Sequence, residues 1–325
     1  MRPAFSVIFL TTLIGAGQGL FLALFTAQSY SLFGLLPTQD SVGFYAPGSA
    51  LALLFLAAGL LASFFHLGRP ERAWRSARQW RTSWLSREVI VLPAFMAVVC
   101  LYGAAHFFGW HPVLVVLPSG IGIDLTVLFG VVGTVLAFAL FVCTGMIYAC
   151  LRFLREWHTP LTVINYVLLG SASGFTLAAA LAAETAPDIA GFYAGWAMVI
   201  TLVGLISRSA SLVRNARLKP KSTLQSAIGI KHPHIVQKTQ GAMGGSFNTR
   251  EFFHGKRSGV LRQLKWFFLA ATFIAPVALL GLSKAPILGV ALAAFLIQYF
   301  GLMAERWYFF AQANHPQNLY YQSVA

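Results

Sequence analysis

The feature that most constrains this chain is a series of eight apolar blocks, each long enough to cross a bilayer. A helix needs roughly 20 mainly apolar residues to span the hydrocarbon layer. Unpaired backbone is not tolerated in lipid, and the short alternating segments of a transmembrane barrel do not occur in the sequence. We therefore predict an all-α fold, a polytopic membrane helix bundle with eight transmembrane helices. The blocks cover about residues 5–27, 46–66, 89–110, 124–150, 161–183, 189–207, 264–283 and 286–309.

Composition supports this class and excludes others. Hydrophobic residues make up 58% of the chain and charged residues only 10%, whereas soluble domains carry about 25% charged residues. The net charge of +14 comes without a basic helix or RNA-binding motif, so nucleic acid is not an expected partner. Cys100, Cys143 and Cys150 lie in apolar blocks without ferredoxin-like spacing, so we expect no iron–sulfur cluster in this chain.

The basic residues are strongly biased to one side. With eight spans, both termini and the connections 2–3, 4–5 and 6–7 share a side, and these segments with their flanks hold 22 of the 23 Lys and Arg residues. This count assigns Arg208 to connection 6–7, and only Lys284 lies on the other side. By the positive-inside rule, both termini are predicted to be on the cytoplasmic side of a bacterial inner membrane. Anionic lipid headgroups there are expected to attract the basic residues.

The connection at about 212–262 is long and contains both basic and aromatic residues, including Arg250 and Phe252. Loops of this length are commonly functional or disordered, but its phenylalanines argue against pure disorder. We interpret it as a docking loop for an acidic soluble partner, within a single integral membrane domain over 1–325. A flexible basic loop is the alternative.

Two proton-exchanging side chains flank the short polar connection between the second and third blocks. His66 closes the second block and Glu88 opens the third, with six arginines from Arg69 to Arg87 along the connection. Sequential helices are usually neighbours, and an imidazole and a carboxylate at one depth can exchange protons with a quinone. The alternative is that both are ordinary helix-end residues, since a glutamate is favoured at a helix start by the helix dipole.

Other polar and small residues have simpler interpretations. His106 and His111 lie at the far end of the third block, roughly 27 Å from the depth of Glu88 at 1.5 Å per residue. They cannot share a haem with His66, so we expect no haem and no metal in this chain. Glu305 and Arg306, at the boundary of the last block, are expected to snorkel toward water. The small-residue runs 15–19 and 170–174 predict close helix packing.

One motif carries a family resemblance. The connection reads His66-Leu67-Gly68-x-Pro70-x-Arg72-Ala73 and then Ser83-x-Leu85-Ser86-x-Glu88, which resembles the dimethyl sulfoxide reductase anchor subunit family. The resemblance implies a haem-free, eight-helix membrane subunit in which His66 and Glu88 bind quinol. It also implies two partners, a four-cluster iron–sulfur subunit and a catalytic subunit holding molybdopterin guanine dinucleotide. Near these two positions, Arg72 and Ser86 are further candidates for quinone binding, and Arg69 and Arg75 are candidate docking charges; for Arg69 and Arg72 both roles stay open.

Within that family, the arginine-rich connection, the long connection 6–7 and the tail at 315–318 resemble the branch that serves sulfite dehydrogenase (quinone). That branch implies electron flow from cytoplasmic sulfite, through molybdenum and the clusters, to ubiquinone or menaquinone. Three alternatives remain open: the anchor of a dimethyl sulfoxide or other S- or N-oxide reductase that uses quinol, an anchor without a redox role, and a secondary transporter. A transporter is expected to show internal repeats and helices broken near the midplane.

Overall fold

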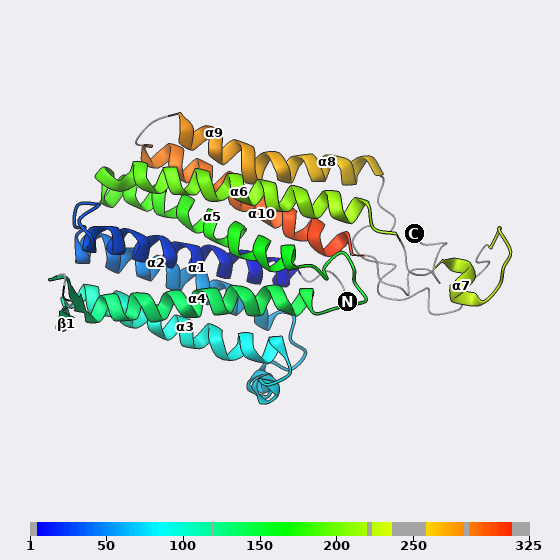
Figure 1. The fold of residues 1–325 in the computed structure, drawn as a ribbon, viewed down its shortest axis with the longest axis horizontal. Coiled ribbons are helices and arrows are strands. Elements are labelled where there is room, and N and C mark those ends of the chain that lie inside the picture. The colour runs from blue at the N-terminus through cyan, green and yellow to red at the C-terminus, as the bar shows by residue number, and fades with distance from the viewer. Residues whose placement is uncertain are drawn as a thin grey trace.

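Among the residues that the structure describes, eight helices of the computed structural model are long and apolar enough to cross a membrane, which confirms the predicted fold class (Figure 1). The structure describes residues 5–116, 118, 120–219, 223–235, 258–282 and 286–313. Two of the eight spans contain a π-helical turn, η1 (Ser41–Tyr45) before α2 and η5 (Ala270–Ile274) between α8 and α9. The remaining bounds are α1 Phe5–Leu32, α2 Ala46–Phe64, α3 Trp84–Phe107, α4 Leu125–Ala149, α5 Pro160–Thr185, α6 Ala190–Ala216, α8 Ser258–Leu269, α9 Ala275–Gly281 and α10 Leu288–Ala311.

The helices lie side by side, with α1 and α5 at the centre of the bundle (Figure 1). Their backbones touch at the predicted small-residue runs: a Cβ built on Gly174 would overlap the carbonyl carbon of Gly19. Only glycine allows the two backbones to approach this closely. In lipid there is no hydrophobic driving force between helices, so close packing of this kind holds them together. Around this pair, α1 packs against α2 and α4, and α5 packs against α6 and α10.

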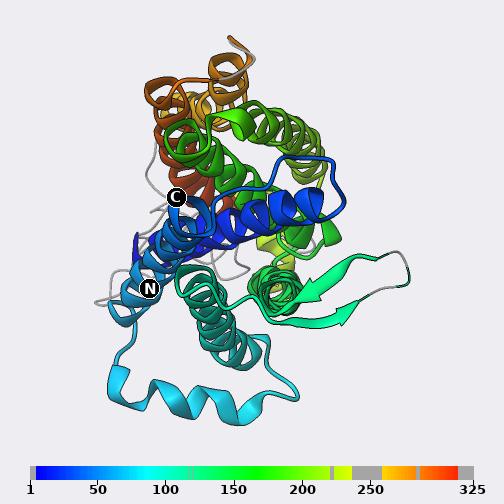
Figure 2. The ribbon, with the colours of Figure 1, turned by 90° about the vertical axis from the view of Figure 1, so that its left-hand side faces the viewer.

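The connections add short elements outside the spans. The 3₁₀ helix η2 (Pro70–Gln79) runs crosswise to the bundle beside α3, and the strands β1 (Val113–Val116) and β2 (Gly122–Asp124) form an antiparallel hairpin between α3 and α4 (Figure 2). Two further short helices are η3 (Pro187–Ile189) and α7 (Leu224–Ile228). The all-α prediction omitted the hairpin. Its short Val-rich strand β1 forms its backbone hydrogen bonds with β2, beyond the far end of α3.

Several predicted boundaries were wrong by a few residues, with consequences for the site. Because Ser83 caps its N-terminus, α3 begins at Trp84, so Glu88 lies inside the helix and not at its first residue. Helix α6 continues to Ala216 and α8 begins at Ser258, so both ends of the predicted docking loop are helical. Arg250 and Phe252 lie outside the described residues.

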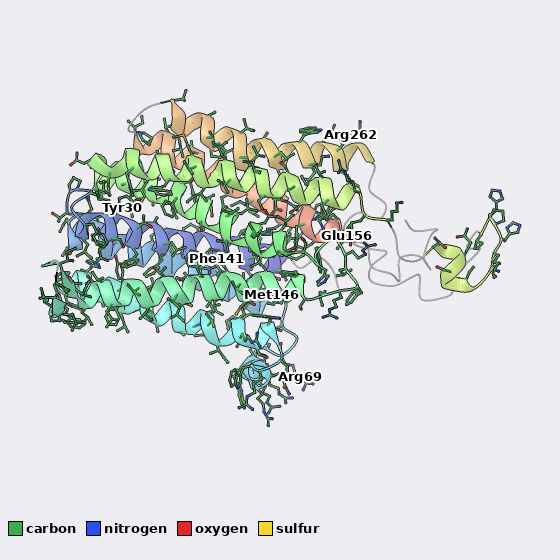
Figure 3. The ribbon with its side chains drawn as sticks, in the orientation of Figure 1. Tyr30, Arg69, Phe141, Met146, Glu156 and Arg262 are labelled. Carbon is green, nitrogen blue, oxygen red and sulfur yellow. The ribbon has the colours of Figure 1, made fainter. Side chains whose placement is uncertain are left out.

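The basic connections share one end of the bundle. The start of α1, η2, the connection between α4 and α5, and the ends of α6 and α10 all lie there (Figure 1). Arg69, Glu156 and Arg262 mark this end, whereas Tyr30 lies toward the opposite one (Figure 3). We call the first the basic end.

Candidate functional site

The connection from α2 to α3 is fastened to the first turn of α3. Ser86 is buried, and its hydroxyl donates a hydrogen bond to the Ser76 carbonyl of η2 at 2.5 Å. The Arg87 guanidinium donates to the carbonyls of Trp80 and Arg81 at 2.9 and 2.8 Å and stacks on Trp84. These bonds hold η2 beside α3 while leaving its arginines exposed.

His66 lies two residues beyond α2, exposed at the basic end. Its Nδ1 is 3.3 Å from the Ser6 hydroxyl of α1. Partial burial lowers the pKa of the His66 imidazole, against a smaller raising effect of its hydrogen bond to the Ala62 backbone. The imidazole is therefore neutral at neutral pH, with one nitrogen able to donate and the other to accept. Its neighbours Phe65 and Leu67 expose apolar surface.

Glu88 is buried in the second turn of α3, with 8% of its surface exposed. The Thr144 hydroxyl of α4 donates a hydrogen bond to its Oε1 at 2.5 Å. Glu88 also lines a cavity of about 20 Å³ between α1, α3, α4, α5 and α10. That is room for about one water. The other polar side chains around the cavity include Thr11, Gln18, Tyr166 and Arg306.

A buried charge cluster adjoins this cavity. The Glu305 carboxylate of α10 forms ion pairs with two arginines. One of its oxygens is 2.7 Å from Arg208 Nε of α6, and the other is 3.1 Å from Arg306 Nη1. All three side chains are at most 5% exposed. Tyr166 lies under the Arg306 guanidinium, 3.9 Å from ring centroid to Cζ. Paired charges of this kind inside a membrane domain mark functional or tightly packed positions.

This cluster corrects two sequence-based predictions. Glu305 and Arg306 do not snorkel toward water: their side chains face the bundle interior, where they pair with each other. Arg208 does not belong to connection 6–7, because α6 extends two turns past it. The signal that could have found them was the placement of ionisable residues next to long apolar runs. The sixth block was ended at 207, just before Arg208, whereas Glu305 and Arg306 lay inside the last block and only their burial was missed.

The structure brings the predicted site residues to one end without bonding them together. In the described part of the chain, no hydrogen bond or ion pair joins His66 to Glu88: the first contacts α1 and the second contacts α4. Arg72 is half exposed and pairs weakly with Glu71, with 3.8 Å between Nε and Oε1. Arg69, the residue before η2, and Arg75 of η2 are exposed.

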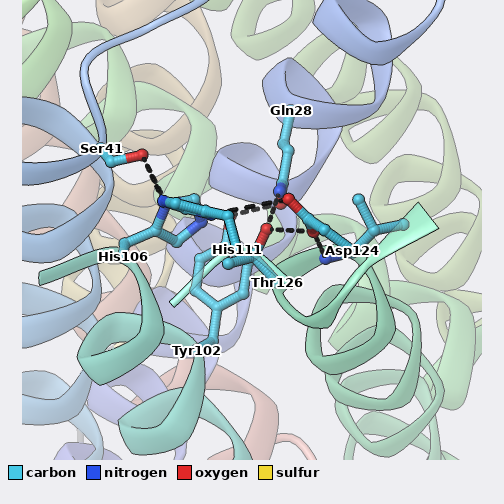
Figure 4. Close-up of polar contacts among 8 residues, drawn as sticks. Gln28, Ser41, Tyr102, His106, His111, Asp124 and Thr126 are labelled. Atoms are coloured by element: carbon cyan, nitrogen blue, oxygen red, sulfur yellow. Dashed lines mark hydrogen bonds and ion pairs between the residues drawn. The ribbon is translucent and has the colours of Figure 1, made fainter. Parts of the chain in front are cut away.

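A second polar cluster lies at the opposite end of the bundle (Figure 4). Ser41 lies within hydrogen-bond distance of both His106 and His111, and His111 Nδ1 is 3.5 Å from Asp124. Thr126 donates to Asp124 at 2.7 Å, which also caps α4. The network fastens the hairpin to η1 and α3. Among the described residues, no group of three or more His, Cys, Asp or Glu is placed to hold a metal ion.

Comparison with known proteins gives a consistent result. A family model described as DMSO reductase anchor subunit (DmsC) matches residues 2–311. The chain is also 60% identical over 328 residues, covering all of both chains, to a sulfite dehydrogenase subunit of Allochromatium vinosum. Both matches extend through the basic end described above.

Proposed function

The chain belongs to the DMSO reductase anchor subunit family, and from this premise we propose that it is the quinone-reactive membrane anchor of a sulfite-oxidising complex. The match along the whole chain to a subunit of a sulfite dehydrogenase supports the sulfite branch. In this proposal, a molybdopterin guanine dinucleotide subunit oxidises sulfite, and a four-cluster iron–sulfur subunit passes the electrons to quinone in this chain.

The observation that carries the quinone assignment is the burial of Glu88 at the end of the bundle where His66 is exposed. Reduction of a quinone takes two electrons and two protons, so the site needs groups that exchange protons next to an apolar surface. His66 offers a neutral imidazole between exposed Phe65 and Leu67. Glu88 offers a carboxyl group held by Thr144 and shielded from lipid.

The side chains of His66 and Glu88 have the hydrogen-bonding and proton-exchanging groups that a quinone head group requires. The imidazole of His66 donates a hydrogen bond to a quinone oxygen and orients the ring. Glu88 takes up and releases protons at its carboxyl group through the water-sized cavity that it lines. Ser86, whose hydroxyl is taken by Ser76, supports the site by fixing η2. Arg72 contributes positive charge near the reduced quinone.

The basic end is the proposed docking face for the iron–sulfur subunit and faces the cytoplasm of a bacterial inner membrane. The exposed Arg69, just before η2, and Arg75 of η2 present positive charge there. Arg250 and Phe252, which lie outside the described residues, are the proposed docking residues of the connection that precedes α8. Charge on one face steers an acidic partner and fixes its orientation.

The test is sulfite oxidation by the intact complex with two acceptors, an artificial dye and a soluble quinone. We expect His66→Ala to retain dye reduction and lose most quinone reduction. Equal loss with both acceptors would instead indicate a docking defect. Unchanged quinone reduction would rule out His66 as part of the site. Sulfoxide-dependent quinol oxidation without sulfite activity would favour the reductase anchor that the family name suggests.

A further inference from the structure

The described part of the chain buries four Asp, Glu, Lys or Arg side chains, and their charges cancel when Glu88 is ionised. Glu88, Arg208, Glu305 and Arg306 are each at most 8% exposed. An unbalanced charge in a low-dielectric interior costs several kcal/mol, so a membrane domain should not retain one. Two arginines against two glutamates gives a neutral set only if Glu88 is counted with the other three.

The geometry of Glu305 leaves one positive charge unmatched. Its single carboxylate is shared, with Arg208 on Oε1 and Arg306 on Oε2. Arg208 also lies over the ring of Phe268 and is not among the residues that line the cavity, whereas Arg306 is. Arg306 is therefore the arginine whose charge reaches the cavity.

Arg306 and Glu88 line the same cavity from different helices, α10 and α3. No direct ion pair between them is found among the described residues, and the space that both line accommodates about one water. Arg306 is fixed on two sides, by Glu305 and by the face of Tyr166 at 3.9 Å. Glu88 is fixed by Thr144. Both groups are thus held facing one water-sized space.

We propose that Arg306 is the positioning residue for Glu88: across the cavity, its positive charge compensates the Glu88 carboxylate. This inference rests on the proposed function. Glu88 takes up a proton from the water phase through the cavity; on transfer, its carboxyl O–H bond breaks and the proton bonds to an oxygen of the quinone that the iron–sulfur subunit reduces. The carboxylate left behind is balanced by Arg306, while Glu305 and Arg208 remain paired with each other.

The test is a double-mutant cycle on the melting temperature of the purified complex, followed through the fluorescence of the membrane subunit. Arg306→Gln and Glu88→Gln are each expected to lower it. On the Glu88→Gln background, Arg306→Gln is expected to lower the melting temperature less, or to raise it, because the buried charges are again balanced. Equal losses on both backgrounds would overturn the proposal. Should Arg306→Gln fail to accumulate, the double variant is expected to accumulate; its failure to do so contradicts the proposal in the same way.

An exposed arginine at the same end supplies the control. Arg152 lies in the connection after α4 and is exposed. Arg152→Gln is expected to have the same effect with and without Glu88→Gln, since exposed charges are screened and distant substitutions add. Coupling to Arg152 as strong as coupling to Arg306 would show a general charge effect and not a specific pair.

Infrared spectroscopy and kinetics separate this role from simple packing. In Arg306→Gln, the infrared band of protonated carboxyl groups is expected to gain intensity. This gain is expected to be absent when Glu88→Gln is added, and the band is expected to stay at the wild-type level in Arg306→Lys. Quinone reduction is expected to fall at least about tenfold in Arg306→Gln and to recover partly in Arg306→Lys. If Glu88→Gln leaves quinone reduction intact, the proposed function fails; if the cycle is additive and the band unchanged, only the pairing fails.

Discussion

The Thr144 hydroxyl of α4 donates a hydrogen bond to the buried carboxylate of Glu88 on α3, at 2.5 Å. This bond crosses between two spans at the basic end and sets the direction in which the carboxyl group faces. A hydrogen bond to a charged acceptor contributes about 1.5–3 kcal/mol, so Thr144 is expected to matter both for α3–α4 packing and for the proposed proton exchange.

Thr144→Val keeps the shape of the side chain and removes the donor. We expect quinone reduction to fall about tenfold, from a loss of about 1.4 kcal/mol in the stabilisation of the carboxylate, with dye reduction unchanged. Thr134→Val is a matched control on the same helix, because the Thr134 hydroxyl bonds only to the Gly130 carbonyl of its own helix. Similar losses in both variants would assign the effect to α4 itself.

The buried charges of Arg208, Glu305 and Arg306 predict a large loss of stability when the carboxylate that the two arginines share is removed. Glu305→Gln removes the carboxylate that pairs with both Arg208 and Arg306, and breaking such a buried pair costs about 3–5 kcal/mol. We expect this variant to accumulate poorly in membranes and to melt at a much lower temperature. Glu156→Gln changes a partly exposed glutamate at the same end and should leave accumulation at the wild-type level.

His66 should give the quinone reaction a characteristic dependence on pH. Burial lowers its pKa below the ordinary value of about 6.5. Quinone reduction is therefore expected to stay constant from pH 8 to 7 and to fall only as the pH drops below about 6.5, when the imidazole gains a proton. The unfolded chain binds that proton at higher pH, so stability decreases in the same window. His66→Asn should lack this step; its persistence would assign the titration to another group.

The attachment of η2 can be tested by proteolysis of the full purified chain. Ser86→Ala removes the bond to the Ser76 carbonyl, a loss of about 1 kcal/mol. Trypsin is expected to cut after Arg72, Arg75 or Arg78 several times faster than in the wild type. Ser63→Ala removes a hydroxyl that bonds within the end of α2 and should leave the cleavage rate unchanged.

The contact between α1 and α5 leaves no space for a side chain. In Gly174→Ala, the added Cβ would overlap the Gly19 carbonyl carbon, so the two backbones must separate. Because overpacking typically costs about 1–3 kcal/mol, we expect a lower melting temperature and less protein in membranes. Gly195→Ala is the control, since its Cβ would meet nothing within 4 Å.

The fold was largely predictable because membrane spans are long and uniformly apolar. Eight spans were predicted and found, and the small-residue runs around Gly19 and Gly174 identified the central contact. The hairpin at Val113–Val116 was missed because a four-residue strand carries little periodic signal. The start of α3 was also missed, although Ser83 and Ser86 form its N-terminal cap.

The candidate site was predicted only in part. The motif containing His66 and Glu88 singled out these positions, but not their surroundings. Thr144 and Arg306 come from helices far away in the sequence, and only the packing of α3, α4 and α10 brings them to the cavity beside Glu88. Arg306 was expected to snorkel because it lies near the end of the last block, but its side chain is buried by the packing of α10 against α5.

The most direct test of this account is the rate of quinone reduction by sulfite in the intact complex carrying Glu88→Gln. Reduction of a dye by the same preparation reports on the catalytic and iron–sulfur subunits. Glu184→Gln, an exposed glutamate at the end of α5 opposite the basic end, is the matched control. The account predicts a selective loss of quinone reduction in Glu88→Gln alone, with dye reduction preserved. Quinone reduction at the wild-type rate in Glu88→Gln would contradict it.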